Sequence, residues 1–412
     1  MNRRHFLKTL ASSIAIPSLL DSYSILAAPL RGKVKITDMK VMIVKGATSD
    51  CPFVRIETDA GITGYGESYW GRGIKDVMLG YLKPMILGED PLDVDRLYSK
   101  MLVYTGGSGA IGGVTITAIS GVEIALWDLV GKILGVPVCK LLGGQYRNKV
   151  KVYSTSSPGN LLDMDSCREF AERIKNGRYG FKIVKTDILR DRDPHEPQNR
   201  QLSNLEITKN VKGYGNLREA LGDAIDIAVH CHWELDWISA LNLARAIAFI
   251  RPVWLEDPMP PEFAQTWVKL TEQSPVPILT GENLYRMQGY MPFIIQQGCH
   301  IVQIDIPKAG GLLESKKIAA LADAFYMPVC AHIASGPLAF MASAQCCAAM
   351  PNFKAHEHSV GNKGEEWEKY VISDGPIIQN GYVQIPDKPG IGVEVNWDYV
   401  RGHLFPGEEW WG

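Results

Sequence analysis

Several short apolar runs in the second half of the chain each end in a side chain that can bind a metal or move a proton. FKIVK ends in an amine, VWLE and FKAHE end in carboxylates, and PVCAH ends in an imidazole. The residues at these run ends are Lys185, His230, His232, Glu256, Glu282, Asp305, His332 and Glu357. If these groups converge, the chemistry they support is proton transfer around a bound divalent metal.

Parallel strands are the elements that would bring these residues together. The apolar runs recur about every 25 residues, which leaves room for one helix between successive strands. Parallel strands that alternate with helices close into a (β/α) barrel, and residues at their carboxyl ends then face one mouth. We therefore predict an α/β fold with a TIM-type barrel over residues 149–384.

Residues 33–148 have a different pattern. The segments VKITDMKVMIVKG and PFVRIETDAGITGYGESYW predict β-strands, with a hairpin turn at DAGITG. Apolar residues at steps of three and four then form one face of a helix: Ile119, Val122, Leu126, Leu129 and Ile133. We predict an α+β capping domain over residues 33–148, to which residues 385–412 return.

The first 28 residues resemble a twin-arginine export signal. Arg3 and Arg4 precede an apolar stretch, LASSIAIPSLL, and a small-residue region near Ala27 and Ala28. The apolar stretch is too short to span a bilayer, so we expect no stable membrane insertion. We expect an exported mature protein, for example in the periplasm.

Composition excludes several other classes of protein. The formal net charge is −2, and no basic face or tail is present, so nucleic-acid binding has little support. The 8 cysteines show no CxxC spacing, which argues against a zinc knuckle or a disulfide framework.

Several motifs, in order along the chain, resemble the enolase superfamily in its mandelate racemase-like branch. They are GITGYGE, ALWDLVGKILGVPVCKLLGG, WLEDP, the GEN strand end, KAGGL and GIGVEV. The resemblance implies a capping domain on a modified (β/α)7β barrel and a homo-oligomer. It also implies a shared half-reaction, in which a base removes the proton α to a carboxylate and a divalent cation, normally Mg2+, stabilises the enediolate.

The resemblance implies a metal site with one unusual ligand. Glu256 and Glu282 are hard oxygen ligands, as Mg2+ requires, and Lys185 would lie beside the substrate carboxylate. His230 stands where the family carries a carboxylate, in a register set by Asp236. Because imidazole favours other ions, Mn2+ or Zn2+ are alternatives to Mg2+, as is a site without metal.

Candidate acids and bases also follow from the resemblance. Asp305 and His332 resemble the His-Asp dyad of the branch, in which the carboxylate holds the imidazole tautomer. His232 occupies the position of the general acid or base of the acid-sugar dehydratases, and Glu357 that of a glutamate that binds the substrate carboxylate. The alternative for Asp305 and His332 is a structural ion pair, and the alternative for His232 is a core histidine.

The choice of reaction rests on the segment Lys185-Thr186-Asp187. Racemases of the branch carry Lys-x-Lys at this position, and the second lysine is one of their two bases. In this chain Asp187 stands in the place of that second lysine. We expect a metal-dependent acid-sugar dehydratase that forms a 2-keto-3-deoxy sugar acid, with His232 and His332 as acid and base. The alternatives are a racemase, epimerase or cycloisomerase, and a non-catalytic exported protein that binds sugar acids.

Substrate contacts are expected from two loops of the capping domain. The segments ESYWGR and YTGGSGAIGG match the loops that close over the barrel in the family. Tyr69, Trp70, Arg72 and Tyr104 are the residues that we expect to contact a sugar acid or hydroxy acid there.

Overall fold

The computed structural model describes the chain except residues 1–31, 47–48, 108–110, 360–363 and 412. The predicted export signal therefore lies outside the described residues.

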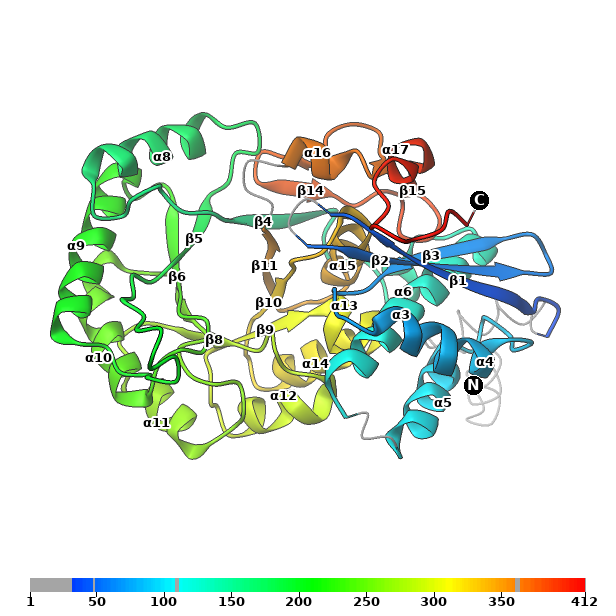
Figure 1. The fold of residues 1–412 in the computed structure, drawn as a ribbon, viewed down its shortest axis with the longest axis horizontal. Coiled ribbons are helices and arrows are strands. Elements are labelled where there is room, and N and C mark those ends of the chain that lie inside the picture. Colours follow the sequence, from blue (N-terminus) through cyan, green and yellow to red (C-terminus); the bar gives the residue numbers. More distant parts are fainter. Residues whose placement is uncertain (1–31, 47–48, 108–110, 360–363, 412) are drawn as a thin grey trace, which may run out of the picture.

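Parallel strands form a closed barrel in the second half of the chain, on the left in Figure 1. The strands are β4 (Lys149–Thr155), β5 (Ile183–Asp187), β6 (Asp226–His230), β7 (Trp254–Glu256), β8 (Ile278–Thr280), β9 (Ile301–Asp305), β10 (Val329–His332) and β11 (Phe353–His358). Each pairs with the next in parallel, and β11 pairs with β4, which closes the barrel. The predicted barrel fold is thereby confirmed.

Helices connect the strands and surround the barrel. They are α8 (Met164–Asn176), α9 (Asn204–Leu221), α10 (Trp237–Ile247), η2 (Ala248–Ile250), α11 (Gln265–Gln273), α12 (Arg286–Ile295), α13 (Ile306–Ala309), α14 (Gly311–Ala324) and α15 (Pro337–Ala348). Side chains fix where some of them begin: Ser203 and Glu206 form a capping box on α9, and Asp236 accepts a hydrogen bond from the Ser239 amide to start α10. Asp236, which set the register of the expected metal ligands, is thus a helix cap.

The first part of the described chain forms a three-stranded antiparallel sheet and a group of helices. The strands are β1 (Ile36–Val44), β2 (Cys51–Thr58) and β3 (Thr63–Glu67). The helical segments are α3 (Ile74–Val77), η1 (Met78–Leu82), α4 (Lys83–Ile86), α5 (Val94–Gly106), α6 (Gly113–Leu134) and α7 (Val138–Leu141). The hairpin and the long apolar helix expected from the sequence are both present.

Helix α6 packs directly against β3. A Cβ atom on Gly66 would lie 2.6 Å from the backbone nitrogen of Ala125, so only glycine allows this approach. The helix is long and apolar enough to cross a membrane, but 83% of its most apolar window is buried inside the molecule. Its apolar surface is therefore used in packing.

The last part of the chain runs from the barrel back to the first sheet, where red and blue ribbons lie together in Figure 1. Its elements are α16 (Gly364–Glu368), β12 (Val371–Ile372), β13 (Ile378–Gln379), β14 (Tyr382–Gln384), β15 (Glu394–Val395) and α17 (Trp397–Arg401). Val44 bridges to Leu404, and Lys75 pairs with Glu408 at 2.6 Å. Trp410 and Trp411 each pack on Trp397.

Two buried glutamates join the first domain to barrel helices. Glu67 at the end of β3 accepts hydrogen bonds from the amides of Gly336 and Ala339 at the start of α15. Glu123 on α6 accepts from the amides of Leu312 and Leu313 at the start of α14. Because helix starts offer unpaired amides, each carboxylate satisfies donors that would otherwise be buried without a partner.

The interior of the barrel is layered. One small cluster contains a residue from each strand: Tyr153, Ile183, Ala228, Trp254, Leu279, Ile301, Cys330 and Ala355. Because side chains alternate along a strand, the interior layer above it comes two residues later. That layer consists of Thr155, Lys185, His230, Glu256, Gly281, Gln303, His332 and Glu357.

Candidate active site

The polar layer of the barrel holds a buried lysine between two carboxylates. Lys185 Nζ lies 2.5 Å from Glu256 Oε1 and 2.8 Å from Glu357 Oε1. Burial opposes the charge on Lys185, but Glu256 and Glu357 outweigh it and raise the pKa of the amine. Burial likewise opposes the charges on both carboxylates, and Lys185 outweighs it and lowers their pKa values. The three residues are therefore charged at neutral pH.

A second group of side chains surrounds a point that suits a cation. Ligand atoms of His230, Glu256, Asp257 and Glu282 all lie within 4.8 Å of one another, and all four residues are buried. His230 Nε2, Asp257 Oδ2 and Glu282 Oε2 are buried and have no hydrogen-bond partner. Unpaired buried acceptors are costly, so these residues fit a divalent ion that would satisfy them.

Burial also raises the pKa values of two carboxyl groups in this cluster, so that they keep a proton at a higher pH than free carboxyl groups do. It raises the pKa of Glu282 to about 8 and that of Asp257 to about 7. At Glu282, burial and the neighbouring carboxylates outweigh the positive charges of His332 and Lys185, which lower its pKa. A divalent cation would add further positive charge at this point.

His332 and Asp305 form a buried pair across neighbouring strands. His332 Nδ1 lies 2.6 Å from Asp305 Oδ2, and the two residues are in register between β9 and β10. His332 Nε2 faces Glu282 Oε2 at 3.3 Å and Glu357 Oε2 at 3.7 Å. Burial opposes the charge on His332, but Glu282, Glu357 and Asp305 outweigh it and raise its pKa to about 9. The imidazole therefore holds a proton more strongly than a free one, and in this arrangement of side chains it is protonated at neutral pH.

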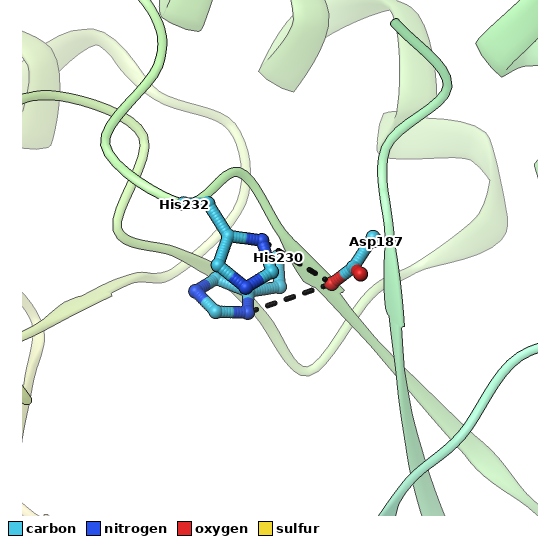
Figure 2. Close-up of side chains that lie close together, drawn as sticks. All are labelled: Asp187, His230 and His232. Atoms are coloured by element: carbon cyan, nitrogen blue, oxygen red, sulfur yellow. Dashed lines mark ion pairs between the residues drawn. The ribbon is translucent and has the colours of Figure 1, made fainter.

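His230 and His232 lie one above the other beside Asp187, as Figure 2 shows. The two imidazole centroids are 3.7 Å apart and the rings are stacked. His232 and Trp233 have φ angles of 51° and 62°, in the left-handed region that non-glycine residues rarely adopt. In this left-handed turn after β6, the imidazole ring of His232 stacks on the imidazole ring of His230.

Three polar residues of the barrel interior were missed from the sequence. Tyr153 donates to Glu357 Oε2 at 2.9 Å, Thr155 also donates to Glu357, and Gln303 donates to Glu256 at 2.9 Å. Gln303 lies two residues before Asp305 on the same strand. Because side chains alternate between the two faces of a strand, the position of Gln303 predicts that it faces the barrel interior, as Asp305 does. Tyr153 and Thr155 belong to β4, whose run ends in no ionisable residue.

The capping segment contributes one residue to the mouth of the barrel. Tyr69 is half-buried, and burial together with Asp305 and Glu282 raises the pKa of its hydroxyl. The buried Lys308 ammonium lies 4.8 Å from the centroid of the Tyr69 ring and donates to Asn283. Lys308 and Asn283 were not expected from the sequence.

The three other expected substrate contacts have exposed side chains. Trp70 and Arg72 are exposed, and Tyr104 is 67% exposed near the end of α5. Their contact with a substrate stays a prediction. Residues 108–110 of the second expected loop lie outside the described residues.

Comparisons with known families agree with this arrangement. Residues 33–143 match the family described as mandelate racemase / muconate lactonizing enzyme, N-terminal domain. Residues 167–399 match the family described as enolase C-terminal domain-like.

Individual relatives cover almost the whole chain. A D-xylonate dehydratase of Haloferax volcanii is 39% identical over 377 residues, which cover 91% of this chain and 90% of that protein. A D-galactonate dehydratase of Verminephrobacter eiseniae is 30% identical and covers 84% of this chain and 88% of that protein. The crystal structure of a mandelate racemase/muconate lactonizing enzyme-like protein from Rubrobacter xylanophilus superposes with a TM-score of 0.85 at 32% identity. It covers 92% of this chain and 99% of that chain.

Proposed function

The chain belongs to the mandelate racemase / muconate lactonizing enzyme family of the enolase superfamily, and from this premise we propose that it is an acid-sugar dehydratase. The substrate would be an aldonic acid, the class named in its relatives D-xylonate and D-galactonate dehydratase. A base would take the proton α to the carboxylate, and the β-hydroxyl would leave as water with a proton from an acid, so the net loss is one water molecule. The enol that forms becomes a 2-keto-3-deoxy acid.

The observation that carries this proposal is the His332–Asp305 pair beside the carboxylate cluster. Asp305 accepts the proton of Nδ1, so Nε2 is the nitrogen that would exchange a proton with a substrate. A cation bound to Glu282 would offset the charge that raises the pKa of His332 most, and would thereby favour the unprotonated Nε2 that a base requires. His332 Nε2 faces Glu282 and Glu357 inside the barrel, where a substrate carboxylate would be bound. The imidazole is therefore placed and oriented as a general base.

The remaining polar residues have complementary roles in the proposal. Lys185 places a fixed positive charge beside the position of the substrate carboxylate. Glu357, which accepts hydrogen bonds from Tyr153 and Thr155, would also accept one from a hydroxyl group of the bound acid. His232 is less buried than His230 and would donate the proton that the leaving hydroxyl requires.

His230, Glu256 and Glu282 would hold a divalent cation. When bound, the ion supplies positive charge against the negative charge that develops on the substrate carboxylate. We propose Mg2+, because two of the three ligands are carboxylates. The imidazole of His230 makes Mn2+ and Zn2+ the ions to compare with it.

Keto-acid formation from a panel of aldonic acids, including D-xylonate and D-galactonate, tests the proposal. The wild-type protein with Mg2+ should form a 2-keto-3-deoxy acid from at least one member. Glu256→Gln should lose cation binding and turnover, whereas Glu272→Gln on the exposed face of α11 should lose neither.

Other outcomes of the panel would identify the alternatives. Exchange or inversion at the α-carbon without keto acid would identify a racemase or epimerase. Binding of a sugar acid with neither exchange nor keto acid would identify a non-catalytic binding protein and contradict the proposal.

We also propose that the protein is exported through the twin-arginine pathway. The support is the Arg3-Arg4 pair before an apolar stretch. Fractionation of cells that express the wild type or an Arg3→Lys, Arg4→Lys variant tests this, because the variant should remain in the cytoplasm. Equal export of both would contradict it.

A further inference from the structure

Asp187 lies at the point where β5 ends, directly beside His230. The two residues are in register between the parallel strands β5 and β6, and His230 is in register with Glu256 on β7. Asp187, His230 and Glu256 therefore form a row across three adjacent strands. One carboxylate oxygen of Asp187 lies 3.6 Å from His230 Nδ1 (Figure 2).

The two nitrogens of His230 have different surroundings. Nδ1 faces Asp187, whereas Nε2 lies 3.8 Å from Glu256 Oε1 and 4.0 Å from Glu282 Oε2 and has no hydrogen-bond partner. A neutral imidazole carries one proton, and a carboxylate beside Nδ1 favours the tautomer with the proton on Nδ1. In that tautomer the lone pair of Nε2 points at the carboxylate cluster, which is the arrangement of a metal ligand.

The same oxygen of Asp187 also faces the second imidazole. Oδ1 lies 3.4 Å from His232 Nδ1. The His230 and His232 rings are stacked with an angle of 30° between their planes. Lone pairs in nearly parallel planes do not converge well on one ion, so the geometry favours one carboxylate oxygen that faces two imidazole nitrogens over a second metal site.

We propose that Asp187 is a positioning residue that holds His230 with Nε2 toward Glu256 and Glu282 and thereby sets the affinity of the cation site. The proposal rests on the proposed function only in that it takes His230, Glu256 and Glu282 as cation ligands. Asp187 does not contact the ion itself. Its shared contact with His232 keeps that imidazole in the corresponding tautomer.

The test is a double-mutant cycle on cation affinity, measured by titration calorimetry with Mg2+ or Mn2+ alone on the purified protein. Asp187→Ala should weaken binding by about 10–100-fold, the range found when a partner of a ligating histidine is removed. In a His230→Asp background, where the ligand needs no tautomer, Asp187→Ala should change the affinity by less than about twofold. Asp223→Ala, which removes an exposed carboxylate paired with Arg251, is the matched control and should leave the affinity unchanged.

Three results would overturn the proposal. Unchanged affinity in Asp187→Ala would show that His230 needs no partner. An equal loss in the His230→Asp background would show that Asp187 acts directly on the ion. Two ions in the wild type, one of them lost in Asp187→Ala, would identify a separate metal site at Asp187, His230 and His232.

The result is independent of turnover. Because the titration needs no substrate, the coupling between Asp187 and His230 can hold even if no aldonic acid is dehydrated. Conversely, dehydration with an unchanged cation affinity in Asp187→Ala would leave the proposed function intact and remove this inference.

Discussion

At the scale of single residues, the contact between His332 Nδ1 and Asp305 Oδ2 determines which nitrogen of the imidazole is free. Asp305 is fully buried at the end of β9, and its partner is in register on β10. The free nitrogen then faces the carboxylates of Glu282 and Glu357. The orientation of the His332 imidazole thus follows from one hydrogen bond and from the register of two strands.

Replacing His332 should impair proton transfer but not cation binding. His332→Asn should lower kcat by about 10²–10⁴-fold, the usual contribution of a general base. Cation affinity should persist, because His230, Glu256 and Glu282 are unchanged. Steady-state kinetics and calorimetric titration of the same preparation measure the two properties.

The control for His332→Asn is a substitution of a histidine at the other end of the barrel. His300→Asn changes a histidine that accepts from the Ile278 amide at the opposite end of the barrel strands, and it should leave kcat unchanged. A His332→Asn variant that retains full turnover would exclude this residue as the base.

At the scale of elements, the contact of α6 with β3 depends on glycine. A Cβ on Gly66 would overlap the helix backbone at Ala125, whereas one on Gly80 would meet nothing within 4 Å. Gly66→Ala should therefore destabilise the protein by about 1–3 kcal/mol through overpacking. Gly80→Ala should change stability by no more than about 0.5 kcal/mol.

Urea unfolding of the two glycine variants measures this difference. A lower midpoint for Gly66→Ala alone supports the close packing of helix and strand. Equal midpoints for both variants would show that the helix moves aside at little cost.

Glu67, which joins β3 to α15, makes part of the stability dependent on pH. Burial raises its pKa to about 7 in the folded protein from the ordinary value of 4.5. Between these pH values the folded state holds a proton that the unfolded state has lost. The stability contributed by this group is therefore present below about pH 4.5, falls as the pH rises to about 7, and is constant above it, by about 3 kcal/mol in total.

Comparison with a neutral side chain tests this dependence. The unfolding free energy of the wild type, less that of Glu67→Gln at the same pH, should decrease between pH 5 and 7 and then remain level. Glu272→Gln, an exposed change, should show no such trend. A difference that increases with pH would mean that the amides of Gly336 and Ala339 stabilise the carboxylate more than burial opposes it.

At the scale of the whole molecule, the interior of the barrel holds more buried carboxylates than paired cations. Glu256, Asp257, Glu282, Asp305 and Glu357 are all buried there. Lys185 pairs with two of them. A divalent cation that binds only the folded state should therefore stabilise the entire protein.

Thermal unfolding with and without the ion measures this stabilisation. Mg2+ at about 100 times its Kd should add about 2.7 kcal/mol of stability, and chelation by EDTA should reverse the gain. Glu256→Gln should show no cation-dependent shift of Tm. An equal shift in Glu256→Gln would place the ion elsewhere.

The sequence predicted the barrel and most of the residues at its mouth because strand ends are local features. Each apolar run ended at a residue that parallel pairing then placed beside its neighbours, as with Asp305 and His332. Contacts that depend on barrel closure were not predictable in this way, as with Tyr153 and Glu357, which pair only because β11 meets β4.

Segments between strands are harder to predict than strand ends. The segment between β5 and β6 contains α9 at Asn204–Leu221, with Ser203 and Glu206 capping its start. Motif similarity predicts that Trp70, Arg72 and Tyr104 contact the substrate, and this stays a prediction because the direction of a loop side chain depends on packing that the sequence does not encode locally. The domain boundaries, the roles of the site residues and a homo-oligomer stay predictions.

The most direct test of the central claim is the reaction of D-xylonate and D-galactonate in D2O with Mg2+, followed by proton NMR. Dehydration predicts a 2-keto-3-deoxy acid with one deuterium at C3, because the enol takes its new hydrogen from the solvent there. With His332→Asn the same product should form about 10²–10⁴-fold more slowly. Deuterium at C2 of recovered substrate without keto acid, or no change in either substrate, would contradict the account.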